Sequence, residues 1–124
     1  MSRERRRIKA KADLQRLEDG YIALLTDALR ECKGGTWGLF GANDTVYERA
    51  GYRKSKSPAR TAVLEAGEEI NRERESLGLD PYVWHERFLA FSRRTHRDNA
   101  LGEPKLAAEL AMELTEAGVL ETSV

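Results

Sequence analysis

Apolar residues recur at steps of three and four along most of this chain, a spacing that places them on one face of a helix. The clearest stretch covers residues 10–33, where this face would carry Leu14, Leu17, Tyr21, Leu24, Leu25, Ala28 and Cys32. Similar faces follow within 58–77, 81–98 and 104–117. No stretch alternates apolar and polar residues between turn signals, as a strand would. The sequence therefore predicts four helices and no sheet.

Residues that favour helix starts and stops mark the ends of these helices. A polar residue followed by proline suits a helix start, because the N–H that proline lacks would have no partner there anyway. This pattern occurs at Ser57-Pro58, Asp80-Pro81 and Glu103-Pro104. Glycine can adopt the left-handed conformation that closes a helix. Glycines stand at three expected helix ends, which are Gly34, Gly78 and Gly118.

These signals predict an all-α, single-domain bundle of four main helices. The chain has 124 residues and a mass of 14.0 kDa, a size that one core can serve. We expect a basic N-terminal arm over 1–9 that can be disordered, a helical domain over 10–120 and a frayed end over 121–124. A long connection rich in Gly and aromatic residues, with room for a short helix, should join the first two helices. The core should centre on Leu17, Tyr21, Leu24, Ile70, Trp84, Phe88, Phe91, Leu110 and Leu114.

Charge is balanced overall but segregated along the chain. The 21 Lys and Arg match the 21 Asp and Glu, so net charge points to no class of partner. Basic blocks at 1–11, 49–60 and 81–97 alternate with acidic ones. If the bundle brings these blocks to one side, they form a positive surface for nucleic acid; otherwise they pair with acidic helices or are solvated. The candidate contacts are Arg5, Arg6, Arg7, Lys9, Arg53, Lys54, Lys56, Arg60, Arg93, Arg94 and Arg97.

The segment at 35–44 is the most unusual part of the sequence, because it combines several Gly residues with two large aromatic ones. It lacks the Gly-Lys-Ser/Thr signature of a phosphate-binding loop. Two interpretations remain open. Trp37 and Phe40 could form an exposed apolar anchor for a partner, or both rings could fold back over the open end of the bundle. The partner-binding candidates are Trp37, Leu39, Phe40, Asn43 and Asp44.

Residues that usually carry catalysis or bind metals are sparse. His85 and His96 would lie about 16 Å apart on one helix, which is too far for them to share a metal. Cys32 is the single cysteine, and the C-terminal end of a helix does not favour a thiolate. We therefore expect no catalytic residue, no cofactor and no metal site.

The turn at 73–81 resembles that of a DNA-binding helix-turn-helix, with Gly78 as the turn glycine. The helix after it would present Tyr82, Val83, His85 and Glu86 near its start. Arg74 stands where two closely crossing helices want a small residue, and an acidic residue at the start of a reading helix opposes phosphate. The similarity is therefore weak.

Three classes of function follow, in decreasing order of expectation. The first is a small non-catalytic protein-interaction module that can self-associate. The alternative is a nucleic-acid-binding protein that uses the basic N-terminal arm and the basic loop, and the third is a domain that binds a small ligand or catalyses a reaction. The partner would be another protein, a second copy or nucleic acid, and not a membrane. No signal-peptide pattern occurs, so we expect a cytoplasmic protein.

Overall fold

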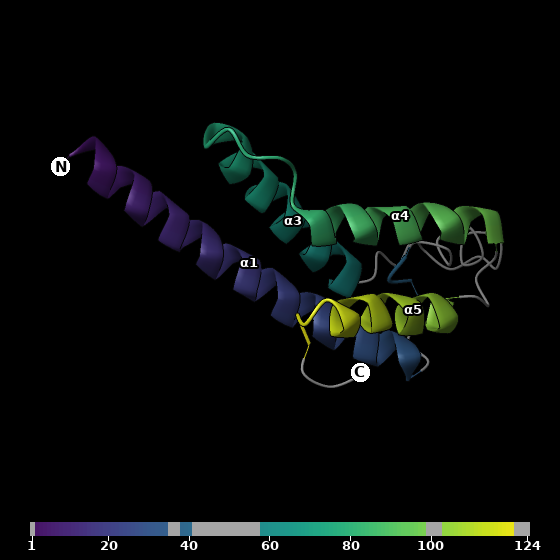
Figure 1. The fold of residues 1–124 in the computed structure, drawn as a ribbon. Coiled ribbons are helices and arrows are strands. Elements are labelled where there is room, and N and C mark those ends of the chain that lie inside the picture. The colour runs from purple at the N-terminus through teal and green to yellow at the C-terminus, as the bar shows by residue number, and fades with distance from the viewer. Residues whose placement is uncertain (1, 35–37, 41–57, 99–102, 121–124) are drawn as a thin grey trace.

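A computed structural model describes residues 2–34, 38–40, 58–98 and 103–120, with the side chains of 95–98 excepted. Within these ranges the chain forms four helices and no strand (Figure 1). The helices are α1 (Arg3–Lys33), α3 (Pro58–Ser76), α4 (Val83–Asp98) and α5 (Glu103–Glu116). The predicted all-α bundle of four main helices is therefore confirmed. The predicted short helix near residue 45 lies outside the described residues.

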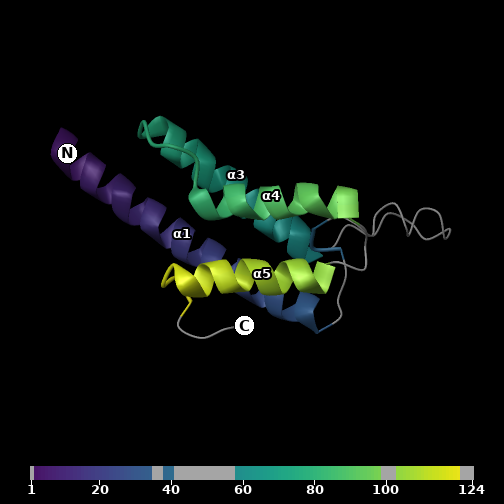
Figure 2. The same cartoon turned by 45° about the vertical axis from the view of Figure 1, so that its right-hand side comes forward.

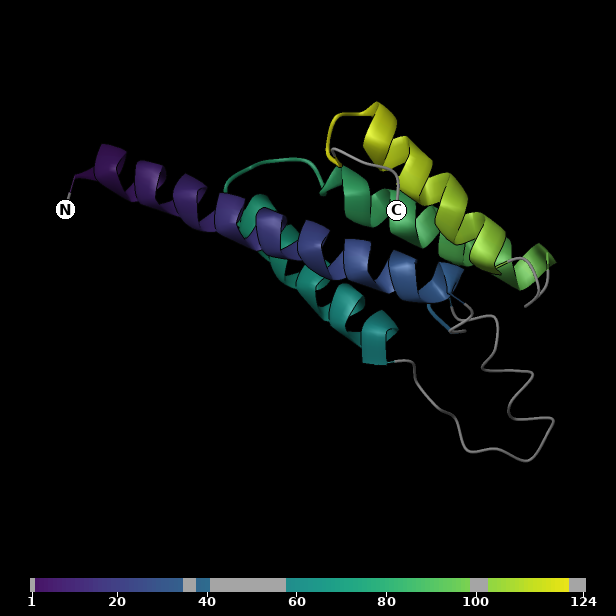
Figure 3. The ribbon, with the colours of Figure 1, turned by 90° about the horizontal axis from the view of Figure 1, so that it is seen from below.

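The longest helix, α1, lies between two of the other helices of the bundle. It packs against α3 on one side and against α5 on the other, and α4 lies beside α5 (Figure 1, Figure 3). Both α3 and α5 run antiparallel to α1, as the colour gradient shows (Figure 1). The N-terminal part of α1 continues past the end of α3, away from the other helices (Figure 2).

Two of the predicted helix ends form as expected. Gly78 and Gly118 have φ angles of 72° and 77°, values that glycine adopts without steric cost. After each of them a backbone N–H reaches back to the last turn, from Leu79 to the Arg74 carbonyl at 2.8 Å and from Val119 to the Leu114 carbonyl at 2.9 Å. This pair of features is a Schellman motif, which satisfies carbonyls at a helix end.

Three helix boundaries differ from expectation. Gly34 ends α1, but with a φ of −77° rather than a left-handed one. The helix α4 begins at Val83, two residues after Pro81. Tyr82 is its N-cap, since the Tyr82 carbonyl accepts from the Glu86 N–H at 3.1 Å and the Tyr82 N–H, which has no partner within the helix, donates to the Asn71 side chain at 2.9 Å. At the other end of the chain, α1 already begins at Arg3, where the Ser2 hydroxyl caps it by accepting from the Arg5 N–H at 3.2 Å. Most of the basic arm predicted at 1–9 is therefore helical.

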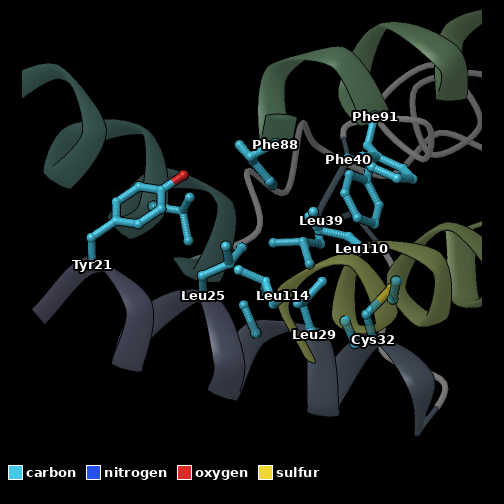
Figure 4. Close-up of a cluster of buried hydrophobic side chains, with 14 of the residues drawn as sticks. Tyr21, Leu25, Leu29, Cys32, Leu39, Phe40, Phe88, Phe91, Leu110 and Leu114 are labelled. Atoms are coloured by element: carbon cyan, nitrogen blue, oxygen red, sulfur yellow. The ribbon is translucent and has the colours of Figure 1, made fainter. Parts of the chain in front are cut away.

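The core lies where all four helices meet, and Figure 4 shows its centre. Six predicted core residues are buried, namely Tyr21, Ile70, Phe88, Phe91, Leu110 and Leu114. Leu17 and Trp84 are partly buried at its margin. The prediction for Leu24 is wrong, since its side chain is 42% exposed. Leu25 and Leu29 occupy the centre of the α1 face instead, and Leu24 lies to one side of that face.

Candidate functional site

The first candidate site is the segment at 38–40, which lies inside the bundle. Leu39 and Phe40 are 2% and 0% exposed. The Phe40 ring lies 5.6 Å from the Phe88 ring and 6.3 Å from the Phe91 ring, measured between centroids. Figure 4 shows Leu39 and Phe40 pointing among side chains of α4 and α5. We call residues 38–40 the docked segment.

Side chains from three helices hold the backbone of the docked segment. The Glu103 carboxylate of α5 accepts the N–H groups of Gly38 and Phe40, at 2.9 and 2.6 Å. Arg60 of α3 donates to the Leu39 carbonyl at 3.1 Å, and Ser92 of α4 donates to the Phe40 carbonyl at 2.9 Å. Arg60 also donates to the Ser92 hydroxyl at 2.9 Å. Buried backbone groups need such partners, which explains why a carboxylate with 0% exposure is tolerated in this core.

The burial of Phe40 decides between the two interpretations for this residue. Phe40 and its neighbour Leu39 pack inward and are not available as an exposed anchor. The other candidates around them, Trp37, Asn43 and Asp44, lie outside the described residues.

Cys32 lies near the docked segment. Burial, and to a smaller extent the charge of Glu103, raises the pKa of the Cys32 thiol to about 12. Cys32 is therefore a protonated core residue, as expected from its place at the end of α1.

A second polar cluster surrounds His85, which is 2% exposed. Its Nδ1 atom shares a hydrogen bond of 2.9 Å with the Tyr21 hydroxyl. The imidazole lies directly against Gly67, where an added Cβ would stand only 2.2 Å from the ring. Burial lowers the pKa of His85, an effect that Glu86 and Glu68 partly oppose. The ring is thus a neutral packing element of the core.

Burial also counts against the helix-turn-helix interpretation. Tyr82 and His85, two of the four residues expected near the start of a reading helix, are 7% and 2% exposed. Side chains that fill the core cannot reach a base in a groove. Arg74, the residue expected to keep the two helices apart, forms an ion pair of 2.8 Å with Glu18 of α1.

The basic blocks do not form one surface in the described part of the chain. Arg60 points inward, as described above, and Arg53, Lys54 and Lys56 lie outside the described residues, as does the side chain of Arg97. On α4, Arg93 is exposed, whereas Arg94 pairs with Glu109 at 2.8 Å and lies over the Phe91 ring. The C-terminal end of α4 and the N-terminal end of α1 lie at opposite ends of the molecule in each view (Figure 1, Figure 2, Figure 3). The N-terminal block and the α4 block therefore cannot share one footprint.

The second candidate site is the N-terminal overhang, by which we mean residues 3–12 of α1. All of its side chains are exposed except that of Ala10, which is partly buried, and Leu14 is the first buried residue of the helix. Six cations lie in the overhang, and none forms an ion pair with a carboxylate in the part of the chain that the structure describes. They are Arg3, Arg5, Arg6, Arg7, Lys9 and Lys11. Glu4 is the single acidic residue of the overhang.

Two other kinds of site are absent from the residues that the structure describes. No group of three or more His, Cys, Asp or Glu side chains is arranged to hold a metal ion there. None of the described helices is both long and apolar enough to cross a membrane. No known protein family, curated protein or solved structure matches this chain.

Proposed function

We propose that this protein binds nucleic acid through the N-terminal overhang and catalyses no reaction. One observation carries the proposal: six cations stand on an exposed helical segment without carboxylate partners among the described residues. Such charges attract phosphates and release the counterions condensed on them, which gives favourable binding free energy at moderate salt. The neutral net charge of the chain does not oppose this, because a local positive field is enough.

The placement of these charges works against the stability of the helix, which is why we assign them a role in binding. Arg3, Arg7 and Lys11 repeat at steps of four, and so do Arg5 and Lys9. Like charges at this spacing repel one another on a helix. Cations in the first turn also oppose the helix dipole. Residues that disfavour the local structure without a compensating contact are expected where function requires them.

The protein-interaction surface predicted around Trp37 has weaker support. Two of its five members, Leu39 and Phe40, are enclosed by the bundle. The N-terminal block acts without help from the basic block of α4, because the C-terminal end of α4 and the N-terminal end of α1 lie at opposite ends of the molecule (Figure 1). The proposal therefore differs from the three-block footprint predicted from sequence, since only the overhang supplies the contacts.

Anisotropy of a labelled DNA duplex of about 20 base pairs, titrated with protein at about 50 and 200 mM salt, tests the proposal. We expect binding at low salt that weakens steeply at high salt. The triple variant Arg3→Gln, Arg7→Gln, Lys11→Gln should lower the slope of log K against log salt by about three, since each phosphate contact contributes about 0.9. Glutamine keeps a good helix propensity, so the overhang stays helical.

A matched control distinguishes the effect of cations in the overhang from the effect of the net charge of the protein. Arg72, Arg93 and Lys105 are exposed, and changing all three to Gln alters the net charge by the same amount elsewhere on the molecule. This control should keep the affinity and the salt slope of the wild type. Absence of binding by the wild type at low salt, or equal losses in the two triple variants, would refute the proposal.

A further inference from the structure

We infer that the nucleic acid is double-stranded DNA, and that the N-terminal overhang lies in its major groove and contacts phosphates on both walls without selecting a sequence. This inference rests on the proposed function and adds the type of nucleic acid and the mode of contact. Three features of the overhang lead to it: its dimensions, the distribution of its cations around the helix, and the absence of aromatic side chains on it.

The dimensions of the overhang fit the major groove of B-form DNA. Ten helical residues span about 15 Å, and a helix with its side chains is about 10 to 12 Å wide. The major groove is about 12 Å wide, whereas the minor groove, at about 6 Å, is too narrow. The major groove of an RNA duplex is deep and narrow, and side chains do not enter it. Nearly all side chains of the overhang are exposed, so they are accessible to a groove.

Five of the six cations form two rows on opposite flanks of the overhang, and Arg6 lies between the rows on the face opposite Ile8. At about 100° per residue, Arg3, Arg7 and Lys11 lie within one narrow sector of the helix. Arg5 and Lys9 form a second row, whose centre lies about 180° from the centre of the first. A helix that sits in a groove has a phosphate backbone on each side. Two opposed rows match that arrangement, whereas a helix lying along the outside of one strand would use only one row.

The face between the two rows supports groove entry as well. It carries Ile8, which is 65% exposed, Ala12, one turn further along the helix, and Glu4 at the edge next to the first row. Small and apolar side chains at this position can approach the floor of the major groove, where thymine presents a methyl group. Neither an Asn nor a Gln occurs in the overhang, so it lacks the side chains that read adenine, and its Arg and Lys residues, which can read guanine, lie outside this face. The contacts are therefore expected to be tolerant of sequence.

Single-stranded nucleic acid fits this surface less well. Proteins that bind single strands stack bases on exposed aromatic rings. The overhang contains no aromatic residue. Among the described residues, the large hydrophobic side chains that are exposed are all aliphatic, namely Ile8, Leu24, Leu79, Val83 and Met112. A single strand would gain the phosphate contacts alone, so the duplex should bind more tightly.

Competition anisotropy on the full chain tests the type of nucleic acid. The competitors are a DNA duplex of about 20 base pairs, one of its strands alone, the RNA duplex of the same sequence, and a DNA duplex whose major groove is filled by glucosylated hydroxymethylcytosine. We expect the plain DNA duplex to compete at least about tenfold better than the other three. Equal competition by all four would overturn the inference and leave the proposed function standing. No binding to any of them would refute both.

A pair of matched variants tests the contact with both walls. Arg7→Gln with Lys11→Gln removes two cations from one row, and Arg5→Gln with Lys9→Gln removes two from the other. Each pair should lower the salt slope by about two and weaken duplex binding by a similar factor. If only one of the two variants lost affinity, the helix would contact one strand of the duplex only, which would overturn its placement in the groove.

Discussion

The N-terminal overhang and the docked segment are both distinctive in the sequence, and the fold treats them in opposite ways. The overhang carries six cations and stays exposed, because none of the other described helices extends far enough to cover it (Figure 2). The docked segment is enclosed, and side chains bond two of its N–H groups and two of its carbonyls. The comparison shows that charge alone does not place a residue at the surface. Glu103 can be fully buried because its oxygens accept from two N–H groups, whereas the cations of the overhang form no ion pair with a carboxylate among the described residues.

Replacing Phe40 should have the largest effect, because it tests whether the docked segment is part of the core. The change Phe40→Ala should lower the free energy of unfolding by about 3 to 5 kcal/mol, the usual cost of removing a buried ring. Urea denaturation followed by circular dichroism measures it. Ile8→Ala in the overhang is the control and should change stability by less than about 0.5 kcal/mol. Similar small losses in both variants would show that the docked segment adds nothing to the core.

Removing the carboxylate that holds the docked segment should have an effect of similar size. Glu103→Ala leaves the N–H groups of Gly38 and Phe40 buried without an acceptor, at about 1 to 3 kcal/mol for each. We expect Glu103→Gln, which keeps one acceptor oxygen, to lie between the wild type and the alanine variant in urea denaturation. Glu116→Ala, an exposed change on the same helix, should be nearly neutral. If it destabilised the protein as much as Glu103→Ala, the hydrogen bonds to the docked segment would not explain the loss.

The pH dependence of stability should reveal the buried His85. Its pKa is lowered in the folded state by burial, so the unfolded chain binds a proton more readily. Stability therefore rises with pH between the folded and the unfolded pKa of His85. The stabilising effect is present above the unfolded pKa of about 6.5 and is lost as pH falls toward the folded pKa. The slope from this one proton is at most about 1.4 kcal/mol per pH unit.

Urea denaturation at pH 7.5 and at lower pH values measures this dependence. In His85→Gln the loss of stability between neutral pH and the range where carboxylates titrate should be smaller than in the wild type, although the variant is less stable throughout. An unchanged pH dependence in His85→Gln would assign the effect to other groups.

The smallest effect on stability should come from the overhang. The triple variant Arg3→Gln, Arg7→Gln, Lys11→Gln removes repulsion between like charges and cations that oppose the helix dipole. We expect stability to stay unchanged or to rise by up to about 1 kcal/mol, while nucleic-acid binding weakens. Parallel urea denaturation and anisotropy measure the two effects. A clear loss of stability would mean that these cations support the fold, which would remove the main reason for assigning them to binding.

Much of the fold could be predicted from the sequence, because its signals are local. The spacing of apolar residues identified all four helices, and Gly78 and Gly118 marked two of their ends correctly. Errors arose where a tertiary contact competes with a local preference. Tyr82, whose N–H donates to the Asn71 side chain, takes the N-cap position that was expected at Asp80, and Leu24 is exposed because the helices packed around α1 cover the sector centred on Leu25.

The candidate sites were harder to predict. The cations of the overhang were visible in the sequence, yet their separation from those of α4 depends on how the helices pack. Of the groups that hold the docked segment, Glu103 was recognised only as a residue near a helix start. Its burial could not be inferred, since nothing in the local sequence shows that the N–H groups of Gly38 and Phe40 come to lie beside it.

By itself, the sequence determined which segments are helical, which of their faces are apolar, and where positive charge gathers along the chain. These properties depend on neighbours within a few residues, whose geometry is set by the helix repeat. Only the tertiary structure decided that Phe40 is buried, that Glu103 and His85 lie in the core, and that the basic blocks at the two ends of the molecule stay apart. Each of these outcomes requires groups tens of residues apart in the chain to meet or to remain separate, and that depends on the packing of whole helices.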